Sequence, residues 1–167
     1  DRLDGSISLH GNTLFRIEGN WETVPRRRRV KQGKRFTYVY ERGGSRLVAY
    51  DARTGSRRWM VGGGKVGSEE FLAGGRFMNA PVPAAGHVLL TLEKDDGLYL
   101  LALDPTDGNV LWQEFLCAYV SSPLPPWSPV GLSVDAGEAY VATGNGVVFA
   151  VDAGGGHVYW AAVYRRE

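Results

Sequence analysis

The feature that most constrains the fold is a thirteen-residue pattern that occurs three times without a gap. Each copy has an Ala, an Asp two residues later, a Gly four residues after the Asp, and a Trp eight residues after the Asp. The copies are Leu47–Trp59, Leu100–Trp112 and Val148–Trp160. They follow one another at intervals of about fifty residues, which is typical of stacked repeat units or propeller blades.

The pattern predicts a β-hairpin in each unit. An apolar strand leads to the Asp, whose carboxylate accepts hydrogen bonds from the amides of the following turn. The Gly supplies the positive φ of a bulged connection, and a second strand leads to the Trp. We expect each Trp to pack its unit against the next one. The shared positions are Ala49, Asp51, Gly55, Trp59, Ala102, Asp104, Gly108, Trp112, Ala150, Asp152, Gly156 and Trp160.

Each hairpin is preceded by another apolar run that ends in a turn. These runs are Phe36–Glu41, His87–Glu93 and Glu138–Thr143, and Asp-Gly or Asn-Gly turns follow the last two. They predict units of three to four antiparallel strands, without a sustained helical period anywhere. Residues 7–17 predict one further hairpin, as the end of a preceding unit or as an edge addition.

At these residues the sequence resembles the pyrroloquinoline-quinone-like (PQQ-like) β-propeller repeat family, with its Ala-x-Asp-x-x-Thr-Gly-x-x-x-Trp motif. The first copy matches in full, with Thr54, whereas Asp107 and Gly155 replace the Thr in the other two. The resemblance implies an all-β propeller of four-stranded antiparallel blades. It also implies that the Trp of one blade docks against the Ala and Gly region of the next.

The length of the chain predicts an incomplete propeller. We expect blades at about 34–75, 76–122 and 123–167, with residues 1–33 as an N-terminal remnant or edge hairpin. Propellers close with about 4–8 blades, and 167 residues hold about three. The remaining blades are expected from the same chain or from another one.

The resemblance implies two functional branches. Quinoprotein dehydrogenases hold PQQ and calcium at the propeller axis, usually under a vicinal disulfide, whereas the branch similar to the outer-membrane assembly lipoprotein binds proteins without a cofactor. Cys117 is the only cysteine, and no calcium-binding set is recognisable. We therefore expect a non-catalytic scaffold for protein–protein interaction, without cofactor, metal or catalytic residues. A fragment of a PQQ-dependent oxidoreductase stays open as the alternative, and the family's frequent export implies a periplasmic or otherwise exported protein.

Charge provides a third hypothesis. Residues 1–60 hold 14 basic and 6 acidic side chains, whereas residues 61–167 hold 5 and 12. The dense basic run at 26–35, with Arg26, Arg27, Arg28 and Arg29, predicts a surface for anionic partners. Nucleic acid is not expected, because no recognition module accompanies the run.

Two further features bear on partners. Trp127 lies outside the repeat among prolines, and we name it as a possible interaction residue. No apolar run approaches the roughly 20 residues that a membrane helix needs, so no membrane span is expected.

Overall fold

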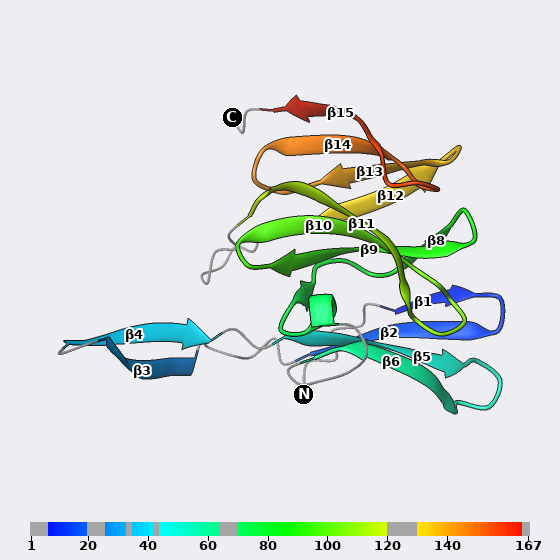
Figure 1. Cartoon of the computed structure of the whole chain (residues 1–167). Coiled ribbons are helices and arrows are strands. Elements are labelled where there is room, and N and C mark those ends of the chain that lie inside the picture. The colour runs from blue at the N-terminus through cyan, green and yellow to red at the C-terminus, as the bar shows by residue number, and fades with distance from the viewer. Residues whose placement is uncertain are drawn as a thin grey trace.

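The computed structural model describes residues 7–19, 26–32, 35–41, 44–63, 70–119 and 130–164; for 26–32 and 35–41 only the backbone is considered. Apart from one short 3-10 helix, η1 (Glu70–Leu72), the regular elements of this part of the chain are β-strands. They form three antiparallel sheets of four or five strands and one separate two-stranded hairpin. The predicted all-β partial propeller is confirmed, and the three larger sheets are its blades (Figure 1).

Each blade follows the order of its strands along the chain, with hairpins joining most of them. Blade 1 consists of β1 (Ile7–His10), β2 (Thr13–Gly19), β5 (Ser45–Asp51) and β6 (Arg57–Gly62). Blade 2 consists of β7 (Arg76–Phe77), β8 (Val82–Ala84), β9 (His87–Lys94), β10 (Gly97–Leu103) and β11 (Val110–Ala118). Blade 3 consists of β12 (Gly131–Asp135), β13 (Glu138–Ala142), β14 (Val147–Asp152) and β15 (Val158–Val163).

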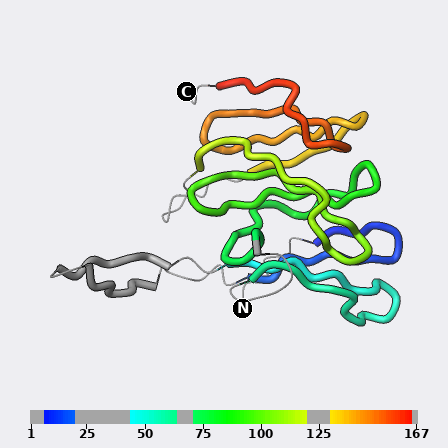
Figure 2. The backbone as a smooth tube through the Cα atoms, in the orientation of Figure 1, coloured from blue at the N-terminus to red at the C-terminus, as the bar shows by residue number. Residues whose placement is uncertain are grey.

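The blades are stacked face to face, with blade 1 lowest and blade 3 highest in Figures 1 and 2. Side chains alternate between the two faces of a strand, so blade 2, in the middle, has one apolar face toward blade 1 and another toward blade 3. Phe15 and Leu47 of blade 1 pack with Leu90 of blade 2. On the opposite face of blade 2, Leu100 packs with Phe149 of blade 3. The core of the molecule therefore consists of the two spaces between the blades.

The strand between residues 36 and 41 corrects the expected composition of the first unit. The sequence suggested that Phe36–Glu41 pairs with the strand before Asp51. Instead, β4 (Arg35–Glu41) pairs with β3 (Arg26–Gln32), and the strand beside β5 is β2. In β2, Phe15 and Ile17 alternate inward and are buried, which fits the core face of a blade. The predicted hairpin at residues 7–17 is present as β1 and β2.

The other upstream runs occupy the predicted places. Strand β9 pairs with β10, and β13 pairs with β14. At the β9–β10 turn, Asp95 and Asp96 themselves have positive φ, at 49° and 59°. Two consecutive positive φ angles form the tight turn whose twist suits a hairpin.

Blades 1 and 2 are also joined through main-chain contacts beside η1 and β7. The Ser45 hydroxyl accepts a hydrogen bond from the buried Phe77 amide at 2.7 Å, and the Ser45 amide donates to the Gly75 carbonyl at 3.0 Å. These bonds fix the start of blade 2 against β5. Among the described residues, no helix has the length and apolar character required to cross a membrane.

Candidate interaction site

The repeated Asp side chains stabilise the turns that follow them. Asp51 accepts hydrogen bonds from the amides of Arg53 and Thr54 at 3.0 and 2.9 Å. It also accepts hydrogen bonds from Arg58 at 2.6 Å and Asn12 at 2.9 Å. The Arg58 hydrogen bond, with the turn amides, holds the pKa of Asp51 at about 2, below its ordinary value of 3.8. The carboxylate is thus engaged in the hairpin itself.

The other two turns use their carboxylates in the same way. Asp104 accepts hydrogen bonds from the Thr106 hydroxyl and amide, which lower its pKa. Asp152 accepts hydrogen bonds from the Gly154 and Gly155 amides at 3.0 and 3.1 Å. All three turns have a register shift just before the Asp, as a bulged hairpin requires.

The tryptophan of blade 1 lies against the turn of blade 2. The Trp59 indole nitrogen donates to the Pro105 carbonyl at 3.1 Å. The ring covers Gly108 so closely that a Cβ added there would lie 2.8 Å from Trp59 Cε3. With φ at +82°, Gly108 also has a backbone conformation that favours glycine.

The same contact recurs between blades 2 and 3. The Trp112 indole nitrogen donates to the Gly154 carbonyl at 2.9 Å, and a Cβ added at Gly156 would lie 2.7 Å from its ring. Each contact therefore consists of an indole on one blade and a turn with a glycine and an acceptor carbonyl on the next. These are the residue types for which the sequence predicts docking.

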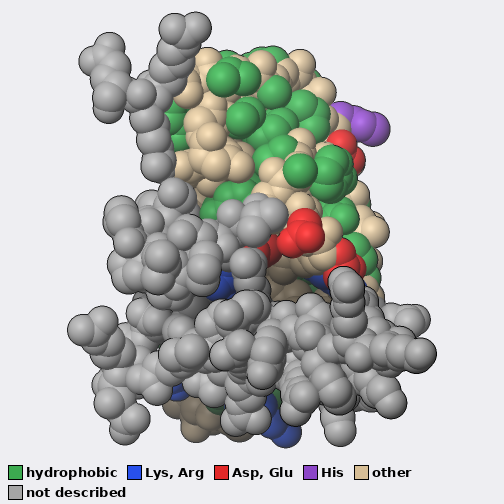
Figure 3. Space-filling view, turned by 90° about the vertical axis from the view of Figure 1, so that its left-hand side faces the viewer, with side chains coloured by type: hydrophobic (Ala, Val, Ile, Leu, Met, Phe, Trp, Pro, Cys, Tyr) green, Lys and Arg blue, Asp and Glu red, His purple; other side chains and the backbone are tan. Residues whose placement is uncertain are grey.

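The third tryptophan lies on an open face. Trp160 is 47% exposed, with the Tyr140 ring centroid 6.3 Å away. No carbonyl of the described residues accepts a hydrogen bond from its indole. Hydrophobic side chains gather at this level of the molecule on the face shown in Figure 3. The exposed large hydrophobic residues at the end of blade 3 are Val158, Tyr159, Trp160, Val163 and Tyr164.

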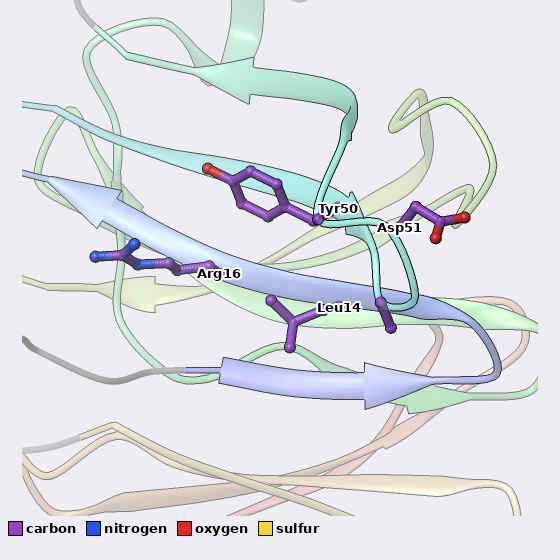
Figure 4. A pocket seen from close by; sticks show the side chains of 6 residues that line it. Leu14, Arg16, Tyr50 and Asp51 are labelled. Carbon is purple, nitrogen blue, oxygen red and sulfur yellow. The ribbon is translucent and has the colours of Figure 1, made fainter.

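Gly55, the turn glycine of blade 1, lies beside a surface pocket of about 330 Å³ (Figure 4). This pocket is at the opposite end of the stack from Trp160. A Cβ added at Gly55 would contact nothing within 4 Å. By their distance from the Asp, Tyr50, Ala52 and Gly55 correspond to Leu103, Pro105 and Gly108, beside which Trp59 packs. The pocket is lined by Leu14, Arg16, Tyr50, Asp51, Ala52 and Gly55.

Charged side chains distinguish this outer face of blade 1. Glu18 accepts hydrogen bonds from Tyr50 at 2.8 Å and Arg46 at 3.1 Å, and lies 4.0 Å from Arg16. The Tyr50 hydrogen bond is the main cause that lowers the pKa of Glu18. Residues in the positions of Arg16 and Arg46 are apolar or aromatic in the other blades: Leu90, Tyr99, Val141 and Val147.

The sequence did not single out this charged face. The available signal was the alternation of Leu14, Arg16 and Glu18 in a strand whose other face is apolar. It was missed because Phe36–Glu41 was expected to supply the strand in this position.

Two other predictions from the sequence concern residues whose side chains the structure does not describe. Arg26–Arg29 belong to β3, for which only the backbone is described, and Trp127 lies outside the described residues. Neither the basic surface nor the role of Trp127 is therefore tested.

The described residues do not form a cluster of acidic, His or Cys side chains of the kind that holds a metal ion. No group of three or more His, Cys, Asp or Glu side chains within them is placed to hold a metal ion. Burial raises the pKa of the Cys117 thiol, and the sequence has no second cysteine for a vicinal disulfide.

Comparisons with known proteins agree on the fold. A family model described as outer membrane protein assembly factor BamB matches residues 10–167. A search of curated proteins finds no match.

Several solved structures are similar. BamB from Moraxella catarrhalis is 22% identical, with a TM-score of 0.45 over 71% of this chain and 30% of its own. A europium-containing methanol dehydrogenase is 13% identical, with a TM-score of 0.59 over 94% and 31%. A quinohemoprotein alcohol dehydrogenase from Comamonas testosteroni is 20% identical, with a TM-score of 0.52 over 75% and 19%. The chain thus spans less than a third of each of these proteins.

Proposed function

Because the chain belongs to the family described as outer membrane protein assembly factor BamB, whose model matches residues 10–167, we propose that it is a non-catalytic segment of a larger propeller. In this proposal its blades bind other protein surfaces, whether further blades or partner proteins. The observation that carries the proposal is the apolar end of blade 3, where Trp160 is 47% exposed beside Tyr140. Exposed apolar patches of this kind mark contact surfaces.

The engagement of the repeated carboxylates supports a structural rather than a chemical role. Asp51, Asp104 and Asp152 each accept hydrogen bonds from their own turns. Calcium requires several convergent oxygen ligands, and these three side chains belong to separate blades. Their repetition follows from the need of every blade for the same turn.

A reconstitution experiment tests the choice between scaffold and oxidoreductase. The full-length protein that contains this chain is incubated with PQQ and calcium, passed through gel filtration, and assayed for quinone absorbance and alcohol-dependent dye reduction. We expect neither retained quinone nor dye reduction. Retained quinone with calcium-dependent turnover would replace the scaffold proposal with the oxidoreductase alternative.

The partner class follows from the description of the family. We propose partners among proteins that assemble outer membrane proteins, and export of the chain to the compartment that holds them. A tagged chain cross-linked in its source cells is expected in the exported fraction, bound to such partners. Recovery in the cytoplasm, or cross-links to none of them, would contradict this part of the proposal.

A further inference from the structure

Blade 1 differs from the other two blades in the connection between its second and third strands. In blade 2, residues 95–96 join β9 to β10, and in blade 3, residues 143–146 join β13 to β14. In blade 1, residues 20–44 join β2 to β5, and they include the separate hairpin of β3 and β4 (Figure 1). Since a short turn is sufficient in the other blades, the pairing of the blade itself does not require this hairpin.

The register of the β3–β4 hairpin sorts its residues into two faces. The two strands pair without a register shift along their whole length. Residues directly opposite each other share a face, and so do alternate residues along one strand. One face therefore has basic residues along β3 and aromatic residues along β4. The pairs on this face, which we call the basic-aromatic face, are Arg27 with Tyr40, Arg29 with Tyr38, and Lys31 with Phe36.

The hairpin has little negative charge to balance its basic residues. Glu41, opposite Arg26, is the only acidic residue in the two strands. The other face has further basic residues at Arg26, Arg28 and Arg35. Like charges on neighbouring strands repel each other, and a two-stranded sheet by itself is only marginally stable in water. Contact with an anionic surface would reduce the repulsion and cover the hairpin.

We propose that the β3–β4 hairpin binds the surface of an anionic lipid bilayer through its basic-aromatic face. Anionic headgroups attract Lys and Arg residues that lie near the membrane surface. Aromatic residues favour the interface between the headgroups and the acyl chains. Both residue types lie side by side on this face, so one contact satisfies both preferences. The hairpin lies on the bilayer and does not cross it.

The distribution of charge favours a bilayer over a single strand of nucleic acid. A strand stacked on the aromatic residues would use the basic residues of the same face. A bilayer is a continuous charged plane, and its attraction extends about 8 Å at physiological salt. Basic residues on both faces of a single-layered hairpin therefore contribute to bilayer binding. This inference goes beyond the scaffold function proposed above and does not depend on it.

Sedimentation with lipid vesicles tests the proposal. The full-length protein that contains this chain, purified without any lipid modification, is mixed with vesicles of phosphatidylcholine and phosphatidylglycerol in equal parts, or of phosphatidylcholine alone. We expect clearly stronger binding to the anionic vesicles. The double variant Arg27→Gln with Arg29→Gln should lower the partition coefficient for these vesicles roughly 30-fold, the loss typical of two basic residues at a membrane surface.

A matched variant removes the same charge elsewhere in blade 1. Arg53→Gln with Arg57→Gln alters two exposed residues outside the hairpin, and it should leave vesicle binding nearly unchanged. The two double variants have the same net charge, so a difference between them reports on the hairpin. Equal losses in the two variants would mean that net charge alone attracts the protein, and would overturn the proposal.

The aromatic half of the face has its own test. Tyr38→Ser with Tyr40→Ser should weaken binding to the anionic vesicles but leave its salt dependence as in the wild-type protein. Loss of Arg27 and Arg29 should instead reduce the salt dependence, because salt screens the charges that remain. Unchanged binding of the tyrosine variant would exclude the basic-aromatic face as the contact surface.

Three further results would overturn the proposal. The first is no binding to anionic vesicles, and the second is equal binding to anionic and neutral ones. The third is tighter binding to a fluorescent oligothymidylate than to the anionic vesicles at the same salt concentration, which would assign the hairpin to nucleic acid. None of these results affects the scaffold proposal, because the reconstitution with PQQ and calcium tests that proposal without lipid.

Discussion

The three turn glycines share a backbone conformation but differ in what packs against them. Gly55, Gly108 and Gly156 have φ angles of 72°, 82° and 81°. The last two are also covered by an indole ring, whereas Gly55 is open. The same substitution at these positions therefore separates backbone strain from interblade packing.

We predict that Gly108→Ala destabilises the chain more than Gly55→Ala. A positive φ costs an Ala roughly 1–2 kcal/mol, and overpacking against Trp59 adds roughly 1–3 kcal/mol at Gly108. Urea unfolding of the two variants and of the wild-type chain measures both losses. Equal losses for the two variants would show that the Trp59 contact is not tight.

The low pKa of Asp51 predicts that the stability of the folded chain depends on pH in the acid range. Its folded-state pKa of about 2 lies below the ordinary 3.8. The ionised side chain therefore stabilises the folded chain above about pH 4, and this contribution is lost as the pH falls toward about 2. The melting temperature of the wild-type chain should fall more steeply across this window than that of Asp51→Asn.

Arg58 supplies a control for this pH dependence, because its hydrogen bond is the main cause of the low pKa. In Arg58→Ala the loss should be smaller and should end at a higher pH, because the folded-state pKa of Asp51 returns toward 3.8. Acid profiles that coincide for the wild-type chain and Asp51→Asn would contradict the assignment.

At the scale of elements, the tryptophan strands join the blades. Trp112 lies on β11, is partly buried against the core between blades 2 and 3, and donates to Gly154. We predict that Trp112→Ala lowers the free energy of unfolding by about 3 kcal/mol, the lower end for a large aromatic side chain. Leu111→Ala, an exposed neighbour on the same strand, should change it little. An unchanged urea midpoint for Trp112→Ala would contradict the docking contact.

The local sequence pattern was sufficient to predict the hairpins but not every pairing between strands. The hairpins after Leu47, Leu100 and Val148 were predictable, because the Asp, the Gly and the flanking apolar runs all act within thirteen residues. The neighbour of β5 was not, because chain proximity favoured Phe36–Glu41 over the more distant β2. Pairing is decided by which strand completes the core face, and Phe15 and Ile17 of β2 do so.

At the scale of the molecule, stability should fall from the middle blade toward the ends. Every interior position of β9 is buried, whereas all six residues of β15 are exposed. In stacked repeats each unit is stabilised by its neighbours, and blade 3 has only one within the described chain. We predict that amides of β9 and β10 exchange slowest and those of β15 fastest in dilute solution.

Hydrogen exchange read by mass spectrometry measures this gradient strand by strand. Equal protection of β15 and β10 would contradict it.

The sequence by itself determined the repeat, the bulged turns, the all-β class and the incompleteness of the propeller. These properties depend on residues close together in the chain, or on a simple comparison of length with period. Only the tertiary structure decided that β1 and β2 complete blade 1, that Gly55 lies beside an open pocket, and that Arg16 and Arg46 line the outer face. These depend on which distant strands share a core and on which face each blade has no neighbour, and neither is set by local sequence.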